Sequence, residues 1–222
     1  MEALIELLPG FYTWSDAATW SGRPGKTFKR SGFAVPLPHA GVLALIDPPG
    51  LSDRVVDELE RLGPPTHVIL TCNWHLRESE ACRKRWDCEL RINELGSATA
   101  ETEIDGTFRH GDRLWDAIDV IHLPHVYWPE ETAFFIAGES SVLVIGDALC
   151  GGREDIGVPN GEIGIFSIRH IADTKAARQT LMGLLEIPCA AICFGHGAPV
   201  LDDAHGALHR FLKRELRVEP DS

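Results

Sequence analysis

The stretch Ile145-Gly146-Asp147-Ala148-Leu149 decides the fold, because a short apolar strand runs directly into a glycine and a carboxylate. Phe194-Gly195-His196-Gly197 repeats this pattern with a histidine. Two earlier apolar strands also end in polar residues, at Ile46-Asp47 and at Leu70-Thr71-Cys72. Ligand sites in α/β proteins gather beyond the carboxyl ends of strands. Four such strand ends in one chain therefore predict one shared cleft.

The apolar segments around these strand ends predict an α/β domain with a mixed sheet and helices outside it. Ser52 and Asp173 are suitable N-caps for two of the helices, and Gly63 ends the first of them. We find no internal repeat and no linker, so residues 1–222 are interpreted as a single domain. The expected strands are residues 42–46, 68–70, 132–136, 141–145 and 190–194. The expected helices are residues 53–62, 78–86 and 204–212, together with one that begins after Asp173.

Composition narrows the classes of function. Hydrophobic residues make up 44% and charged residues 24% of the 222 residues, as in a globular protein. The net charge of -12 disfavours binding to nucleic acid or to anionic membranes, because both are polyanions. The N-terminus is too short and acidic for a signal peptide, and no apolar run approaches the roughly 20 residues that span a bilayer. We therefore expect a cytoplasmic protein that takes a small-molecule substrate or ligand, and the sequence fixes no oligomeric state.

The six cysteines form no CxxC pair, and a chain of this length folds without disulfides. We expect most of them to be reduced, buried thiols.

In order and spacing, five segments resemble the metallo-β-lactamase superfamily across nearly the whole chain. The resemblance implies a four-layer αββα sandwich with mixed sheets and a site at one edge between the sheets. It also implies that Asp147 occupies the position of the metal-bridging aspartate and His196 that of the final metal histidine. The implied activity is hydrolysis of an ester, thioester, lactam or lactone by metal-activated water. The five segments are Leu45–Gly50, Val68–Thr71, Pro129–Ala133, Ile145–Leu149 and Phe194–Gly197.

The chain departs from the family pattern where the histidine-rich motif should follow the second strand. Residues 71–78 read Thr-Cys-Asn-Trp-His-Leu-Arg-Glu and hold a single histidine, His75. If one residue is inserted, His75 replaces the second histidine of the motif. Arg77 then stands at the aspartate position and Glu78 at that of the last histidine. The third metal histidine is also displaced: counting back from Pro129 gives Tyr127, and His125 would reach the site only through a local bulge.

A catalytic zinc needs about three protein ligands and one open position. His75, Asp147 and His196 satisfy this count, so the sequence predicts a site for at most one ion of zinc, iron or manganese. A dinuclear site needs about twice as many ligands. The possible additional ligands are Cys72, Glu78, His125 and Tyr127.

A metal-free site is the alternative. A guanidinium binds no metal, so Arg77 near Asp147 would supply fixed positive charge in place of the cation. A buried Asp147 with neither partner would be costly. Two hypotheses follow. One is a metal-dependent hydrolase with Asp147, His75 and Arg77 as catalytic residues. The other is a binding or interaction module without hydrolase activity, in which Trp74, Tyr127 and Trp128 form an apolar pocket.

Overall fold

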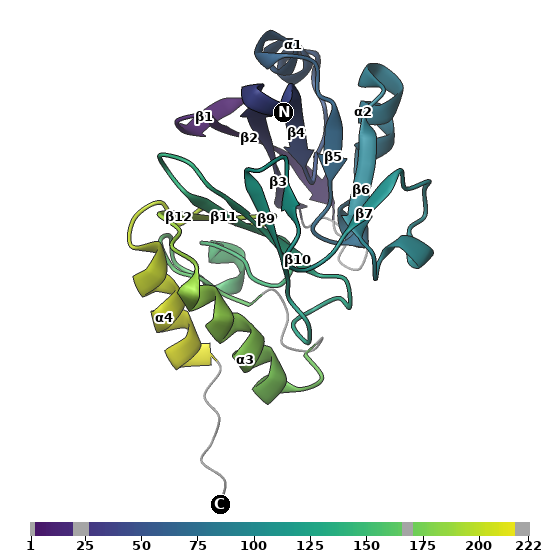
Figure 1. Cartoon of the computed structure of the whole chain (residues 1–222). Helices are drawn as coiled ribbons and strands as arrows, with labels where there is room; N and C mark the ends of the chain where they lie inside the picture. The colour runs from purple at the N-terminus through teal and green to yellow at the C-terminus, as the bar shows by residue number, and fades with distance from the viewer. Residues whose placement is uncertain (1–2, 20–26, 166–170, 216–222) are drawn as a thin grey trace, which may run out of the picture.

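The computed structural model describes residues 3–19, 27–165 and 171–215, in which strands form two sheets and helices cover their outer faces (Figure 1). The helices are α1 (Asp53–Leu62), α2 (Ser79–Trp86), α3 (Thr174–Gly183) and α4 (Ala204–Glu215). The strands are β1 (Ile5–Leu8), β2 (Phe11–Thr19), β3 (Thr27–Leu37), β4 (Val42–Ile46), β5 (His67–Ile69), β6 (Glu89–Asn93), β7 (Gly106–Phe108), β8 (Arg113–Leu114), β9 (Ile118–His122), β10 (Thr132–Ile136), β11 (Val142–Ile145) and β12 (Ala191–Phe194).

Both sheets are mixed. The first has the order β1-β2-β3-β4-β5-β6-β7, with antiparallel pairing from β1 to β4 and parallel pairing from β4 to β7. The second has the order β12-β11-β10-β9-β8, and only its β11–β12 pair is parallel. The expected hairpin of residues 132–136 and 141–145 is confirmed as the β10–β11 pair, whose second strand starts one residue later.

Three apolar clusters divide the molecule into four layers. The middle cluster lies between the sheets and joins side chains such as Phe33 of the first sheet to Phe134 of the second. A second cluster packs α1 and α2 on the first sheet, with Leu59 against Leu45. The third packs α3 and α4 on the second sheet, where Phe211 lies in the same cluster as Leu143. The αββα sandwich expected from the sequence is confirmed.

Local signals place the helices as expected. The Ser52 hydroxyl accepts a hydrogen bond from the Val55 amide at 3.3 Å, and the Asp173 carboxylate accepts one from the Ala176 amide at 2.9 Å. Each cap satisfies an amide that the first helical turn leaves free. Strand β5 begins and ends one residue earlier than expected.

The strands β1, β2 and β3 are absent from the sequence-based expectation. Strand β3 contains Gly32 and Pro36, and β2 contains the polar pair Ser15-Asp16, so neither shows the alternation that marks a half-buried strand. Of the six cysteines, five are buried and Cys189 is half-buried, and all are free thiols, as expected. In the described parts of the chain, none of the helices has both the length and the apolarity that a bilayer crossing requires.

Candidate metal site

Parallel pairing of β11 and β12 brings Asp147 and His196 together. Ile145 of β11 is in register with Phe194 of β12, so the Gly-Asp and Gly-His pairs leave the sheet at the same edge. The first sheet does the same, because Ile46 of β4 pairs with Ile69 of β5. The Thr132 amide donates to the Thr71 carbonyl at 2.9 Å and joins the two edges. All four strand ends named by the sequence therefore surround one small volume.

The glycines that precede Asp147 and His196 make room for their neighbours. A Cβ on Gly146 would lie 2.2 Å from the Thr71 hydroxyl oxygen, and one on Gly195 would lie 2.8 Å from Cε1 of His75. Real Cβ atoms do not approach other atoms so closely, so both positions require glycine. The site is assembled by close packing of the two sheet edges.

His75 bridges two buried carboxylates. Its Nδ1 lies 2.7 Å from Oδ2 of Asp47, and its Nε2 lies 3.2 Å from Oδ1 of Asp147. Asp47 also accepts hydrogen bonds from the amide and the hydroxyl of Thr71, at 2.9 and 2.6 Å. Asp47 therefore fixes both the loop and the orientation of the imidazole.

His196 faces the same carboxylate oxygen from the other side. Its Nε2 lies 3.3 Å from Oδ1 of Asp147, while its Nδ1 lies 3.0 Å from the Lys29 carbonyl. A carbonyl oxygen only accepts, so the Nδ1 of His196 carries the proton. The Phe28 ring packs on His196 with ring centroids 5.4 Å apart. The imidazole is thus held with its Nε2 toward Asp147.

The two histidines have opposite electrostatic environments. Burial and the charge of Arg77 act to lower the pKa of His75, but Asp47 and Asp147 outweigh them and raise it. Burial lowers the pKa of His196, and the contact with Asp147 offsets only part of this decrease. Burial acts to raise the pKa of both aspartates, yet the neighbouring imidazoles hold the pKa of each carboxyl below its usual value.

Arg77 points into the site. Its Nη1 donates to the carbonyls of Ser31 and Asp47 at 2.9 and 3.1 Å, and its Nη2 lies 3.5 Å from Nε2 of His196. Among the described residues no ion pair joins Arg77 to Asp147, so the direct pair expected from the sequence is not formed. The two side chains influence each other only through their charges. The backbone at Arg77 has a φ of 37°, which turns its side chain back toward the strand ends.

Cys72 is the fourth group with metal-binding chemistry. One ligand atom each from Cys72, His75 and Asp147 lie within 4.8 Å of one another, and all three residues are buried. Burial, with the negative charges of Glu131 and Asp147, holds the pKa of the Cys72 thiol well above its usual value. Without a cation beside it, Cys72 is therefore a protonated thiol, and the nucleophilic thiolate is disfavoured.

Glu131 forms the floor of the site and was not singled out by the sequence. Its Oε1 accepts from the Ala148 amide at 3.1 Å, and its Oε2 has no hydrogen-bond partner within the described chain. Burial, reinforced by Asp147, raises the pKa of this carboxyl well above its usual value. Burial therefore disfavours the charged form of Glu131.

Three aromatic residues cover the other oxygen of Asp147. The Trp128 indole Nε1 donates to Oδ2 of Asp147 at 3.3 Å, and Tyr127 packs edge-on against Trp128. Trp74 stacks on Trp128 with centroids 5.3 Å apart and is 69% exposed. The aromatic cluster named from the sequence thus exists at the mouth of the site, with Trp128 in direct contact with a candidate ligand.

The remaining candidates differ in their place. His125 is exposed and has a φ of 68°. Tyr127 packs against Trp128, and burial together with the nearby negative charges of Asp147 and Glu131 raises the pKa of its hydroxyl to about 12. Glu78 is the N-cap residue of α2 and donates its amide to the Pro48 carbonyl. Sequence reasoning missed the role of Asp47 as the holder of His75. The available signal was its strand-end position, which the resemblance marks as the first aspartate of the family.

Comparison with known proteins identifies the fold. No family model matches the chain, and no curated protein matches its sequence. Several solved metallo-β-lactamases have the same architecture. The enzyme from Erythrobacter litoralis with β-mercaptoethanol in its active site superposes with a TM-score of 0.72 at 12% identity, covering 95% of this chain and 94% of that one. The metallo-β-lactamase from Hirschia baltica gives 0.68 at 11%, covering 92% and 96%, and DIM-1 gives 0.71 at 10%, covering 95% of both chains. At these identities the likeness establishes the fold.

Proposed function

Because the chain has the metallo-β-lactamase fold, we propose that it is a hydrolase with one metal ion held by His75, Asp147 and His196. The proposed substrates are small molecules with an ester, thioester or lactone-type bond. Zinc, iron and manganese all accept imidazole and carboxylate ligands. The donor set of this site fits any of the three.

One observation carries the proposal. Both histidines donate their Nδ1–H to an oxygen, His75 to Asp47 and His196 to the Lys29 carbonyl. In a neutral imidazole this leaves the lone pair on Nε2, and both Nε2 atoms face Oδ1 of Asp147. Three electron pairs would then converge, and a metal cation among them would stabilise this arrangement. The oxygen-held, Nε2-presenting histidine is also the usual outer-shell arrangement of a metal ligand.

The separations fit a tetrahedral ion. Zinc bonds of about 2.0–2.2 Å at tetrahedral angles place ligand atoms about 3.3–3.5 Å apart. The two nitrogen-to-oxygen distances at Asp147 are 3.2 and 3.3 Å. Its second oxygen accepts from Trp128, which leaves one oxygen for a metal and supports a site for a single ion. The proposed site is therefore mononuclear.

A bound metal ion of this kind polarises a carbonyl group and makes water a stronger acid. The chain supplies the surroundings. Asp47 holds His75 in place, and the aromatic pair Trp74 and Trp128 offers an apolar surface at the mouth. Arg77 borders His196 with a fixed positive charge, where it would stabilise negative charge on a substrate oxygen.

Metal content tests the proposal. Protein purified without an affinity tag and loaded with each metal in turn should retain about one equivalent by elemental analysis. Asp147→Ala and His196→Ala should each reduce this to background, whereas Asp155→Ala, an exposed aspartate beyond the site, should not. Less than about a tenth of an equivalent in the loaded wild-type protein contradicts the proposal. Retention of metal in both site variants would mean that the ion lies elsewhere.

Charge balance supports a second candidate, a metal-free binding module. Asp47 and Asp147 are buried carboxylates, and a protonated His75 together with Arg77 neutralises them without any metal. In this form His75 donates from both nitrogens, and Nη2 of Arg77 faces the lone pair of His196. The same metal analysis separates the two candidates, because this arrangement needs no ion and gains no stability from one.

A further inference from the structure

A short 3-10 helix (Asn73–His75) after β5 joins Cys72 to His75. The His75 amide donates to the Cys72 carbonyl at 3.1 Å, so the two residues close one turn. Side chains three positions apart in a 3-10 turn lie on the same side. In agreement with this, one ligand atom from each of Cys72, His75 and Asp147 lies within 4.8 Å of the other two. The local backbone thus directs a sulfur atom, as well as an imidazole, toward Asp147.

The spacing of these three atoms is close to that of ligands on one ion. A sulfur and a nitrogen on the same zinc ion lie about 3.6 Å apart, because their bonds to zinc are about 2.3 and 2.0 Å long. A side-chain adjustment of about 1 Å at Cys72 therefore brings the sulfur into bonding range. Cys72 is fully buried, so its thiol meets this site and no solvent.

The charges around the site favour one further anionic ligand. Asp47 and Asp147 are buried carboxylates, and Arg77 is the neighbouring cation. With neutral imidazoles, a divalent metal ion would leave this group with one excess positive charge. Burial disfavours the charged form of Glu131, so this side chain does not remove the excess. A thiolate at Cys72 would bring the sum to zero, and uncompensated charge is costly in a buried site.

Glu131 is the rival donor. Its Oε2 has no hydrogen-bond partner within the described chain, so it is a buried oxygen that a cation could satisfy. Among the described residues, however, the group of closely spaced ligand atoms comprises Cys72, His75 and Asp147, and Glu131 is not part of it. The spacing therefore favours the sulfur over this carboxylate.

We propose that Cys72 is a thiolate ligand of the metal ion at Asp147, beside His75, and that it makes the site selective for zinc over manganese. This inference rests on the proposed metal-dependent function. On binding, the Cys72 S–H bond breaks, its proton leaves to water, and the sulfur electron pair forms the bond to the ion. Thiolate suits zinc, whereas manganese prefers oxygen ligands. Zinc sites expand to five ligands during catalysis, so His196 and a substrate oxygen are accommodated as well.

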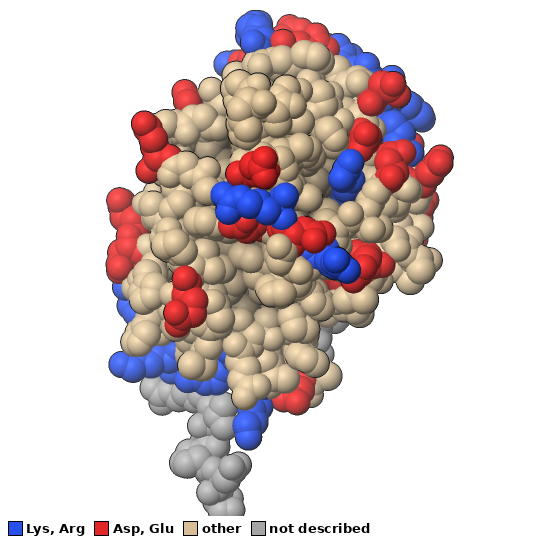
Figure 2. All heavy atoms as spheres, in the orientation of Figure 1, with Lys and Arg blue, Asp and Glu red and all other residues tan. Residues whose placement is uncertain are grey.

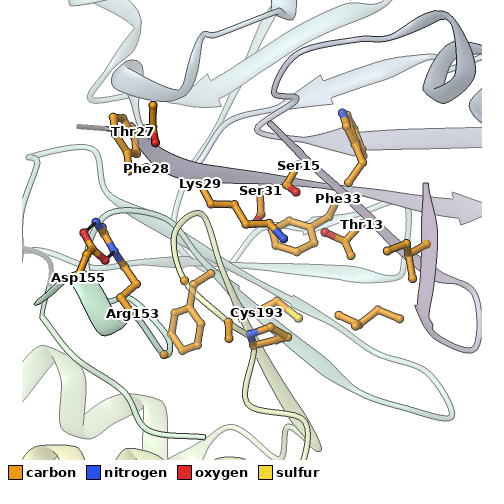
Figure 3. A pocket seen from close by; sticks show the side chains of 18 residues that line it. Thr13, Ser15, Thr27, Phe28, Lys29, Ser31, Phe33, Arg153, Asp155 and Cys193 are labelled. Atoms are coloured by element: carbon orange, nitrogen blue, oxygen red, sulfur yellow. Dashed lines mark hydrogen bonds and ion pairs between the residues drawn. The ribbon is translucent and has the colours of Figure 1, made fainter. Parts of the chain in front are cut away.

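Cys193 is a matched control, because it is an equally buried thiol in different surroundings. It lines the pocket of Figure 3, between β3 and the end of β12, together with apolar side chains such as Phe33 and Phe194. Burial raises the pKa of its thiol, and within the described part of the chain it belongs to no group of metal-binding side chains. Loss of either sulfur therefore leaves a similar small cavity, but only Cys72 should affect the metal.

Cobalt substitution tests the inference, because a cobalt–thiolate bond gives a near-ultraviolet charge-transfer band that oxygen ligands do not give. Figure 2 shows acidic side chains along the outline of the molecule, and such carboxylates take up metal without any bond to sulfur. The metal-free full chain is loaded with one equivalent of cobalt(II), and the spectrum and the cobalt content are measured on the same sample. We expect the band in the wild-type protein and in Cys193→Ala, and its loss in Cys72→Ala.

Metal selectivity gives a second measurement. In a competition titration with a chelator, Cys72→Ala should weaken zinc binding by more than the roughly tenfold that an outer-shell partner is worth, because it removes a ligand. The affinity for manganese should stay unchanged. Cys193→Ala should alter neither affinity, and equal losses of zinc affinity in the two variants would overturn the proposal.

The outcomes separate this inference from the proposed function. One equivalent of bound cobalt without the band overturns the role of Cys72 and leaves the proposed hydrolase in place. A band that survives in Cys72→Ala has the same meaning. Less than about a tenth of an equivalent of every metal contradicts both proposals. If Cys72→Ala does not fold, Cys72→Ser keeps the size of the side chain and takes its place in each measurement.

Discussion

The two halves of the candidate site are built differently. Asp147 and His196 stand at the ends of neighbouring parallel strands, and backbone pairing in the sheet fixes their positions. His75 and Arg77 stand in the loop after β5, where side-chain contacts to Asp47 and backbone carbonyls fix them. We call Asp147 and His196 the strand-end half, and His75 and Arg77 the loop half. The strand-end half tolerates no shift in register between β11 and β12, because such a shift would move both residues. The loop half accommodates an inserted residue, because the Asp47 carboxylate orients the His75 imidazole.

The difference predicts where each half is vulnerable. Removing a strand-end side chain leaves the backbone pairing of β11 and β12 in place. Removing Asp47 takes away the support of the whole loop half, including three hydrogen bonds to Thr71 and His75. Substitutions in the two halves should therefore differ in their effect on folding as well as in their effect on metal.

The largest expected effect is that of Asp47→Ala on stability. The substitution removes the carboxylate closest to the buried His75, and breaking a buried ion pair costs about 3–5 kcal/mol. Urea unfolding of the metal-free protein measures this loss, with Asp57→Ala on the exposed face of α1 as the control. A loss below about 1 kcal/mol would show that Asp47 does not hold the loop half, and the contrast between the halves would fail.

The sequence predicts the strand-end half because apolar runs mark strands and polar residues mark their ends. Asp147 and His196 follow buried strands directly, so their meeting point is fixed once β11 and β12 pair. The same reasoning places α1 and α3, whose caps are local signals. These features depend on residues that are neighbours in the chain.

The loop half escapes prediction because its contacts are distant in sequence. Asp47 and His75 are 28 positions apart, and a strand-end aspartate looks like an ordinary turn former. Trp128 reaches Asp147 across 19 positions through a loop with no periodic pattern. Glu131 reads as a polar residue before a strand, and only the folded chain shows that it is buried and that burial raises the pKa of its carboxyl. Packing between segments, which no local pattern encodes, decides each of these positions.

A smaller effect is expected from pH, with opposite signs for the metal-free and metal-loaded protein. His75 has a raised pKa, so its contribution to stability is present below its unfolded value near 6.5 and is lost as pH rises through the folded value. Asp47 and Asp147 have lowered pKa values, so their contributions are present above about 3.8 and are lost as pH falls. The metal-free protein should therefore lose stability as pH rises above about 6.5.

Metal binding requires the neutral imidazole, so the stabilisation by zinc should grow over the same pH range. Thermal unfolding with and without zinc measures both slopes. His75→Gln removes this contribution and should reduce the slope of the metal-free profile. A metal-free profile that rises with pH in the wild-type protein would contradict the charged His75. A zinc effect that shrinks with pH would argue against His75 as a ligand.

The smallest expected effect is that of Trp128→Phe on zinc affinity. Trp128 supports the strand-end half from a loop, through one hydrogen bond of 3.3 Å to Oδ2 of Asp147. Outer-shell partners of a metal ligand are worth about 10–100-fold in affinity, and this long contact belongs at the lower end. Trp74→Phe is the matched control, because Trp74 shares the stack but makes no bond to Asp147. Competition titration with a zinc chelator should show about tenfold weaker binding for Trp128→Phe and no change for Trp74→Phe. Equal losses of zinc affinity in both variants would mean that the stacked pair Trp74 and Trp128 acts through packing. The position of Asp147 would then depend on side-chain contacts, as that of His75 does.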